Sequence, residues 1–140
     1  MANYNAYLRT NYFSVADEEK FRKIFDNVQA GDNIEIFETE KNGEKQFGFG
    51  LYGSIYGLSQ NGDDGPEPSI EDFWSALQEV LIQGDAILIT EVGYENLRYL
   101  TGFCHVITKT DIMFVDLNEK SLETARTLLG DPQYQTQMDY

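Results

Sequence analysis

Two stretches of the sequence repeat one order of features: an amphipathic helical pattern, a Gly-Asp pair, and apolar residues at every second position. The first helical pattern has its apolar positions at Phe21, Ile24, Phe25 and Val28, and the second at Phe73, Leu77, Val80 and Leu81. Gly31-Asp32 and Gly84-Asp85 end these patterns, and each pair leads into an Ile-x-Ile-x-Glu segment. A helical period that changes to alternation indicates helices connected to the strands of a sheet.

Residues 19–57 and 71–107 align as two copies of a helix, a Gly-Asp turn, a strand and a hairpin. A duplication explains this alignment, and so does a helix-to-strand order that arose separately in the two halves. If the repeat is real, it predicts a pseudo-symmetric sheet with its helices on one face. The sequence leaves both explanations open.

The remaining patterns complete the set of expected elements. Helices are predicted over about 17–30, 70–83 and 119–129, because a glycine follows each end and a capping residue is available at each start: Ser14 or Asp17, then Ser69, then Asn118. Strands are predicted over 4–15, 34–38, 46–52, 86–91, 97–108 and 112–116, with a tight hairpin turn at Asn42-Gly43. The chain is therefore predicted to form one α+β domain over 1–140, mainly an antiparallel sheet of about six strands with three helices.

The chain is strongly acidic, with 24 Asp and Glu residues against 10 Lys and Arg and a formal net charge of −14. This charge repels phosphate backbones and anionic membranes, so direct binding to nucleic acid or to a membrane is not expected. The same charge attracts basic protein surfaces, including the grooves in which nucleases hold DNA. Acidity that only keeps the protein soluble is the alternative explanation.

Composition also bears on the compartment and on metal chemistry. The first residues lack the basic and apolar run of a secretory signal, and no apolar stretch approaches the length of a membrane-spanning helix, so a cytoplasmic location is expected. One cysteine, Cys104, and one histidine, His105, cannot supply an internal disulfide or a Cys/His zinc site. No metal and no cofactor are predicted.

An acidic segment leads into the second predicted helix. Residues 59–68 have the composition of an exposed, mobile loop. Residues 63–72 contain no basic residue and five carboxylates: Asp63, Asp64, Glu67, Glu71 and Asp72. Helix capping and loop solvation would explain part of this segment, because acids complement the positive end of a helix. The functional interpretation is a patch that occupies a cationic groove, with aromatic anchors at Tyr52, Tyr56, Trp74, Tyr94 and Tyr99.

Two further motifs resemble known sites without their context. Gly48-x-Gly50-x-x-Gly53 matches the dinucleotide fingerprint, but no helical pattern follows it, which favours glycines in places of close packing. Cys104 and His105 are neighbours on a predicted strand, so their side chains are expected on opposite faces and cannot form a catalytic pair.

Two glutamates end the equivalent strands of the proposed repeat. If those strands lie side by side, Glu38 and Glu91 could approach as an acid/base pair. Together with Asp32 and Asp85 they could also hold a divalent cation, although no calcium-loop motif is present. Solvated charge at the ends of strands is the alternative for these carboxylates.

Three segments give the chain a resemblance to a known group of proteins. They are Arg9-Thr10-Asn11-Tyr12-Phe13, Phe47-Gly48-Phe49-Gly50-x-Tyr52-Gly53-Ser54-Ile55 and Tyr94-Glu95-x-Leu97-Arg98-Tyr99-Leu100-Thr101-Gly102. With these segments the chain looks like small acidic proteins of Firmicute mobile elements, which resemble anti-restriction and anti-CRISPR inhibitors in size and charge. The resemblance supplies no catalytic residue and no cofactor.

The sequence supports one main hypothesis and two alternatives. The main hypothesis is an inhibitor, not an enzyme, that covers the basic surface of a CRISPR effector or nuclease as a partial DNA mimic. The first alternative is an immunity protein against a basic nuclease toxin. The second is an enzyme or small-nucleotide-binding protein that uses Glu38, Glu91 or His105 in a cleft between the repeats. The oligomeric state is left open, a dimer included.

Overall fold

The computed structural model describes residues 4–59 and 67–137, except for the side chain of Tyr99. Its helices are α1 (Glu18–Ile24), the 3₁₀ helix η1 (Phe25–Asn27), α2 (Ile70–Val80) and α3 (Leu117–Leu129). Its strands are β1 (Asn5–Thr10), β2 (Val28–Ala30), β3 (Glu35–Lys41), β4 (Glu44–Leu51), β5 (Ile55–Leu58), β6 (Ile87–Glu95), β7 (Tyr99–Ile107) and β8 (Ile112–Asp116).

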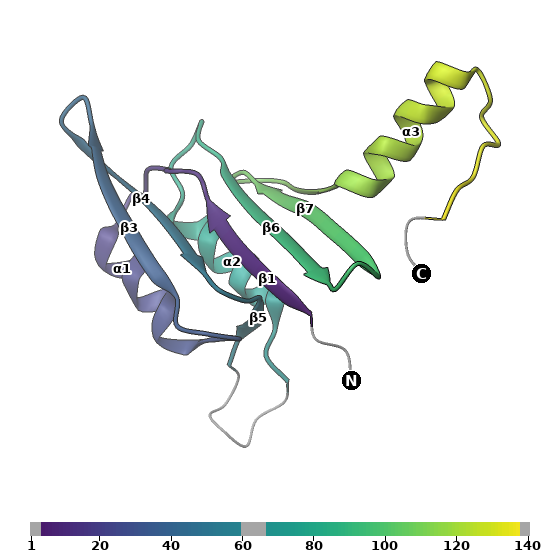
Figure 1. Ribbon diagram of the computed structural model, residues 1–140. Helices are drawn as coiled ribbons and strands as arrows, with labels where there is room; N and C mark the ends of the chain where they lie inside the picture. Colours follow the sequence, from purple (N-terminus) through teal and green to yellow (C-terminus); the bar gives the residue numbers. More distant parts are fainter. Residues whose placement is uncertain (1–3, 60–66, 138–140) are drawn as a thin grey trace.

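Six strands form one sheet in the order β3-β4-β1-β6-β7-β8, and β2 pairs with β5 in a separate two-stranded sheet (Figure 1). Every neighbouring pair is antiparallel. The predicted α+β class with a mainly antiparallel sheet is therefore confirmed. β1 lies between β4 and β6, so the first strand of the chain joins the two halves of the sheet.

The β3–β4 hairpin turns where the sequence predicts it. Asn42 and Gly43 have φ angles of 54° and 81°, the left-handed geometry of a tight two-residue turn that matches the twist of the strands. The meander of β6, β7 and β8 also follows the three predicted strands in order.

The two helices that cover the sheet begin at side-chain caps. Asp17 Oδ1 accepts a hydrogen bond from the Lys20 N–H at 3.1 Å at the start of α1. Ser69 Oγ accepts one from the Asp72 N–H at 3.1 Å at the start of α2. The caps predicted at Asp17 and Ser69 are thus confirmed.

α2 ends earlier than predicted. Leu81 leaves the helix to form an isolated bridge with Val15. Lys109 Nζ then donates to the carbonyls of Gln78, Glu79 and Leu81 at 3.2, 3.2 and 3.0 Å. A cation at this end complements the negative pole of the helix.

The first helix is also shorter than predicted. α1 stops at Ile24, one 3₁₀ turn follows, and Val28 enters β2, where it pairs with Leu58 of β5. The prediction of a helix over 17–30 was wrong in its last third. Pairing of a β-branched residue with a distant strand outweighs the local helical pattern there.

The first strand ends at Thr10, although the alternating pattern continues to Val15. Thr10 Oγ1 accepts a hydrogen bond from the Phe49 N–H at 3.0 Å, and Asn11 Oδ1 accepts one from the Leu88 N–H at 2.8 Å. Two side chains thus take the place of backbone acceptors, and the regular ladder stops at this point.

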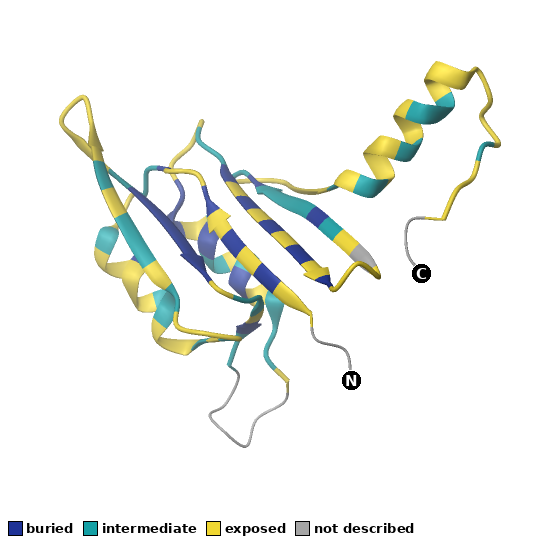
Figure 2. Cartoon of the chain, viewed as in Figure 1, coloured by how far each residue is buried: buried dark blue, intermediate teal, exposed yellow. Residues whose placement is uncertain are grey.

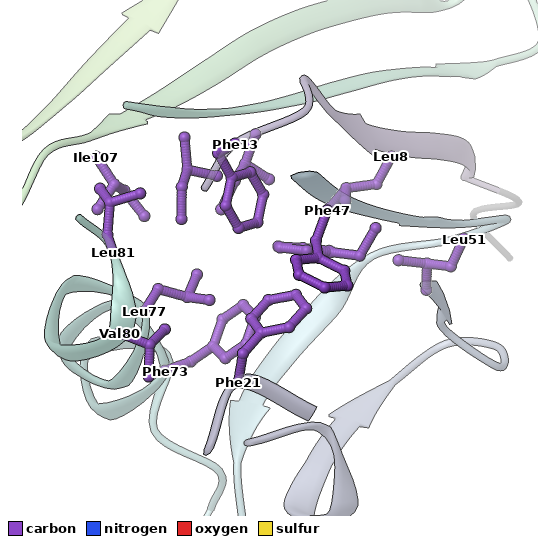
Figure 3. Close-up of a cluster of buried hydrophobic side chains, with 13 residues drawn as sticks. Leu8, Phe13, Phe21, Phe47, Leu51, Phe73, Leu77, Val80, Leu81 and Ile107 are labelled. Atoms are coloured by element: carbon purple, nitrogen blue, oxygen red, sulfur yellow. The ribbon is translucent and has the colours of Figure 1, made fainter. Parts of the chain in front are cut away.

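One hydrophobic core fills the space between α1, α2 and one face of the sheet (Figure 3). Its largest members are five buried phenylalanines from the segment after β1, from α1, from β4 and from α2: Phe13, Phe21, Phe47, Phe49 and Phe73. Contacting rings among them have centroids between 5.4 and 6.2 Å apart, in edge-on or tilted arrangements.

Neither α1 nor α2 covers the opposite face of the sheet, and α3 reaches it with Leu117, which lies against Gly102 of β7 (Figure 1). β1 and β6 alternate strictly between buried and exposed side chains, as expected for strands with one covered face (Figure 2). The exposed side chains of β6 include Leu88, Val92 and Tyr94. α3 projects away from the sheet, and none of its side chains is buried.

The two stretches that align in the sequence both contain a helix followed by a hairpin of two strands, but the first also contains η1, β2 and most of β5. α1 and α2 pack against the same face of the sheet (Figure 1). β3, however, is an edge strand, whereas β6 lies inside the sheet. The equivalent strands therefore differ in their surroundings, and the internal repeat stays a prediction.

Candidate functional site

Five tyrosines surround one pocket at the end of the sheet where β1 begins and β4 and β6 end. The pocket has a volume of about 390 Å³. Its tyrosines come from the segment before β1, from β1, from the turn after β4, from β5 and from β6: Tyr4, Tyr7, Tyr52, Tyr56 and Tyr94. We call this group the tyrosine pocket. Tyr52 and Tyr56 are the most exposed of the five, at 70% and 54%.

Glycines permit the close approach of the tyrosine rings. A Cβ at Gly93 would overlap the ring and hydroxyl of Tyr4. A Cβ at Gly31 would lie 3.2 Å from the Tyr56 hydroxyl. Tyr7 and Tyr52 meet edge-on with ring centroids 5.4 Å apart. The tyrosine rings of the pocket thus pack directly against the backbone of glycines.

A buried carboxylate lies behind the tyrosine pocket. Glu91 of β6 is only 6% exposed. The Tyr4 hydroxyl donates to Glu91 Oε2 at 2.9 Å, and the Ser54 hydroxyl donates to the same oxygen at 3.1 Å. These two bonds offset part of the cost of burying a charge. They also link Tyr4, at the mouth, to the interior of the protein.

The start of α2 carries the described part of the predicted acidic patch. Glu67, Glu71 and Asp72 are all exposed. Leu58 of β5 and Ser69 exchange backbone hydrogen bonds at 3.0 and 2.9 Å, which attaches this segment to the strand that holds Tyr56. The acids and the tyrosine pocket are thus connected through β5.

Ion pairs neutralise the acids around α1 more than they do Glu67 and Glu71. Around α1, Lys and Arg side chains pair with Glu18, Glu19 and Glu38 at 3.0 to 3.9 Å. Over the described residues, no ion pair involves Glu67 or Glu71. Asp63 and Asp64, also predicted for this patch, lie outside the described residues, as does the side chain of Tyr99.

Trp74 lies away from the tyrosine pocket, on a second cavity of about 320 Å³ beneath α2. Its ring stacks on His105 of β7, with centroids 4.8 Å apart and planes 33° apart. Glu91, Ser54 and Phe103 line the same cavity. Burial lowers the pKa of His105 below its ordinary value of 6.5, so its imidazole is neutral at pH 7. We call this space the inner cavity.

The two glutamates of the proposed acid/base pair do not meet. Glu38 is on edge strand β3 and is exposed, where Arg22 donates to its Oε1 at 3.1 Å. Glu91 is on β6, and both β4 and β1 lie between the two strands. The predicted pairing depended on neighbouring strands, so the structure contradicts it.

The two aspartates of the proposed cation site have local backbone roles. Asp85 accepts hydrogen bonds from the Ser14 N–H and the Ala86 N–H, both at 2.8 Å. Asp32 Oδ1 accepts one from the Asn33 N–H at 2.7 Å. Among the described residues, no cluster of three or more His, Cys, Asp or Glu side chains could hold a metal ion.

The glycines of the dinucleotide-like motif lie where backbones come close, as predicted from the sequence. A Cβ at Gly50 would lie 2.7 Å from the Leu8 carbonyl oxygen, and one at Gly48 would lie 3.0 Å from that of Asn11. β5 follows the motif in place of a helix. This arrangement does not form a phosphate-binding helix start.

Cys104 and His105 do point to opposite faces of β7. Cys104 pairs with the exposed Thr90, and His105 pairs with the buried Ile89. The prediction that they cannot act as a pair is therefore confirmed. Tyr4 and Tyr7 were missed as site residues, although an aromatic cluster at the start of the first strand was visible in the sequence.

Comparisons with protein-family models, with curated proteins and with solved structures find no match to this chain. In the described part of the chain, no helix has both the length and the apolar character that a membrane span requires.

Proposed function

We propose that this chain inhibits a bacterial nucleic-acid-targeting defence enzyme, such as a CRISPR effector or restriction nuclease, by docking against its basic DNA-binding surface. The observation that carries the proposal is the group of five tyrosines around one pocket at the end of the sheet where β1 begins. β5 attaches this pocket to the segment that carries Glu67 and Glu71, and these two acids make no ion pair among the described residues. On this proposal the chain is a binding protein and not an enzyme.

The two parts of this surface have different roles in binding. Exposed tyrosines supply contact area at low entropic cost and are typical anchors of protein interfaces. Exposed carboxylates without a cation beside them attract a basic partner over a distance and raise the association rate, an effect that salt screens. A charge of −14 directs the chain to surfaces that bind DNA.

Neutralising the acids at the start of α2 is expected to slow association. The double variant Glu67→Gln/Glu71→Gln should lower the association rate with the partner about tenfold at low salt and far less at high salt. Its matched control is Glu40→Gln/Glu44→Gln, which removes the same charge from the exposed β3–β4 hairpin. Stopped-flow binding to purified CRISPR effectors and restriction enzymes, with cleavage assays in parallel, measures both.

The variant Tyr52→Ala tests the role of tyrosine as an anchor on the same partners. It should weaken binding about thirtyfold, and the loss should be the same at low and at high salt. Equal slowing by the two charge variants would show that net charge alone matters and not the patch. Failure of the wild-type chain to bind or inhibit any enzyme of the panel at low salt would refute the proposed function.

A second candidate function follows from the inner cavity, because Glu91 and His105, two residues of the predicted small-ligand site, both line it. The cavity presents a carboxylate, a neutral imidazole and aromatic walls, and none of its lining residues is Lys or Arg. We infer that a small apolar molecule with a cationic amine fits these groups better than a nucleotide phosphate does.

The only tryptophan of the chain, Trp74, lines this cavity and gives a direct optical test. Phenethylamine should change the Trp74 fluorescence with saturation, and the neutral phenethyl alcohol should bind at least about tenfold more weakly. Glu91→Gln should remove the preference for the amine, whereas Glu119→Gln on α3 should keep it. Equal responses to the amine and the alcohol in the wild type would rule out the proposed role of Glu91.

A further inference from the structure

α3 is a helix of 13 residues without a single buried side chain. Its C-terminal end is well formed, since Gly130 takes the left-handed conformation at φ 65° and its N–H bonds back to the helix. Arg126 Nε also donates to the Tyr134 carbonyl at 2.9 Å, so the following segment folds back along the helix. Isolated helices of this length are only marginally stable in water, and most helices gain stability from a packed face. α3 therefore lacks the packing that such a helix needs.

α3 exposes three leucine side chains that would be more stable in an apolar contact than in water. Leu117, Leu128 and Leu129 are 61%, 82% and 61% exposed. Two acids and two basic residues balance along the helix, Glu119 and Glu123 against Lys120 and Arg126, so α3 has no net charge. In a chain of net charge −14, this is a neutral segment with exposed leucines.

The side of β6, β7 and β8 that faces away from α1 and α2 offers a matching surface. Leu117 of the same chain lies on it against Gly102. The apolar side chains of this surface are 39% to 70% exposed, and we call them the open face: Leu88, Val92, Leu100, Met113 and Val115. Glu91 and Glu95 of β6 are buried, and β7 contains no acidic or basic residue apart from the neutral His105. β8 is an edge strand of the sheet, and its residues 112–115 are all exposed.

Exposed apolar edges of this kind promote association between chains. Two copies of a chain with this charge repel each other unless they meet through surfaces without net charge. The open face and α3 are both such surfaces. The sizes also agree, because a 13-residue helix is about 20 Å long and 10 Å wide and three neighbouring strands span about 14 Å.

We propose that the chain forms a symmetric dimer in which α3 of each copy packs across the open face of the other. The arrangement is self-complementary, as two-fold symmetry requires, because each chain supplies one helix and one face. The leucines of α3 then cover the aliphatic and methionine side chains of β6, β7 and β8. The dimer leaves the acids at the start of α2 and the exposed Tyr52 and Tyr56 for another partner, whereas Tyr7 and Tyr94 of the tyrosine pocket border the open face. The mass of the chain alone tests the dimer without reference to the proposed function.

The dimer is tested by sedimentation equilibrium over a wide range of protein concentrations. The wild-type chain should have twice the mass of the monomer. Leu128→Lys on α3 and Met113→Glu on the open face should each weaken the dimer about a hundredfold, because each places a charge in an apolar contact. Thr127→Lys is the matched control, since it adds the same charge as Leu128→Lys at the adjacent α3 position and should not change the mass.

A mixture of the two weakened variants distinguishes this arrangement from other dimers. In the mixed dimer, one helix-to-face contact is wild type. In the other contact, the lysine introduced on α3 meets the glutamate introduced on the open face, and opposite charges that face each other attract. The mixture should therefore recover the mass of a dimer. Circular dichroism of each variant should show a folded protein, because both substituted side chains are exposed.

Three results would overturn the proposal. A wild-type monomer at all concentrations would assign the open face to a different partner. A dimer that tolerates both variants would place the contact elsewhere on the chain. Loss of the dimer in both variants without recovery on mixing would rule out the reciprocal exchange of α3.

Discussion

The variant Gly57→Ala is expected to lower the free energy of unfolding by about 3 kcal/mol or more, through backbone strain together with overpacking. Gly57 has a φ of 135°, a conformation that residues with a side chain rarely adopt. A Cβ at this position would overlap the Ser69 carbonyl carbon and lie 2.5 Å from the Ile70 nitrogen. These are backbone atoms at the start of α2, so the clash cannot be relieved by turning a side chain.

The loss of stability should be largest in β5 and at the start of α2, next to the candidate site. Moving Ser69 would break its two backbone hydrogen bonds with Leu58 and displace the cap on Asp72. Hydrogen exchange should therefore show faster opening of β5 and the first turn of α2 than of β6. Urea unfolding followed by circular dichroism measures the change in stability.

Gly84→Ala is the matched control for strain without a clash. Gly84 has a φ of 89°, and a Cβ there would meet nothing within 4 Å. This variant should cost about 1 to 2 kcal/mol from the left-handed backbone alone. If Gly57→Ala is no more destabilising than Gly84→Ala, then the packing of β5 against α2 is looser than the structure indicates.

Local features of the fold were predictable because they depend on neighbouring residues. The Asn42-Gly43 turn, the cap of α2 at Ser69 and the end of α3 at Gly130 each follow from a few consecutive side chains. The start of α3 shifted only slightly, from the predicted Asn118 cap to Asp116. Such features are set by steric limits and hydrogen bonds within one turn.

Pairings between distant segments were not predictable in the same way. Nothing local in residues 5–10 indicates that β1 inserts between β4 and β6. This insertion separates Glu38 from Glu91. Val28 likewise leaves its helical pattern to pair with Leu58, because the two-stranded sheet provides backbone partners that the helix end lacks. The helix was extended through Val28 because of its local pattern, and Glu38 was placed near Glu91 because the equivalent strands of the proposed repeat were assumed to be neighbours.

The candidate site depends on that same insertion. Tyr52 and Tyr94 belong to distant segments of the chain, and β1 brings them together by placing Tyr7 between their strands. Tyr52, Tyr56 and Tyr94 were predicted as anchors because the chain has nine tyrosines, a residue type typical of interfaces, and not because of their positions. Trp74 was predicted for the same surface, but it lies beside the buried stripe of α2 and is half-buried on the inner cavity.

The largest loss of stability from a single core side chain is expected for Phe49→Ala, at about 3 to 5 kcal/mol. Phe49 is fully buried, and its ring lies 5.1, 6.2 and 6.0 Å from those of Phe25, Phe13 and Phe73. Phe25 belongs to η1, Phe13 to the segment after β1, and Phe73 to α2, so one ring contacts three separate segments.

The structure gives little room for the cavity left by Phe49→Ala to close. Gly48 and Gly50 flank Phe49, and both lie against the backbone of the first strand or the residue after it, which prevents β4 from shifting inward. The loss in the free energy of unfolding should therefore lie near the upper end of the range for such a substitution. It would remove a large part of the stability of a typical domain, which is about 5 to 15 kcal/mol.

Phe114→Ala provides the comparison, since it makes the same change at a ring that is 54% exposed on β8. It should cost about 1 kcal/mol or less in the free energy of unfolding. Urea unfolding of the two variants at equal protein concentration measures the difference. Similar costs at the two positions would mean that the phenylalanine cluster does not form the packed centre of this fold, and the positions of α1 and α2 on the sheet would then require another cause.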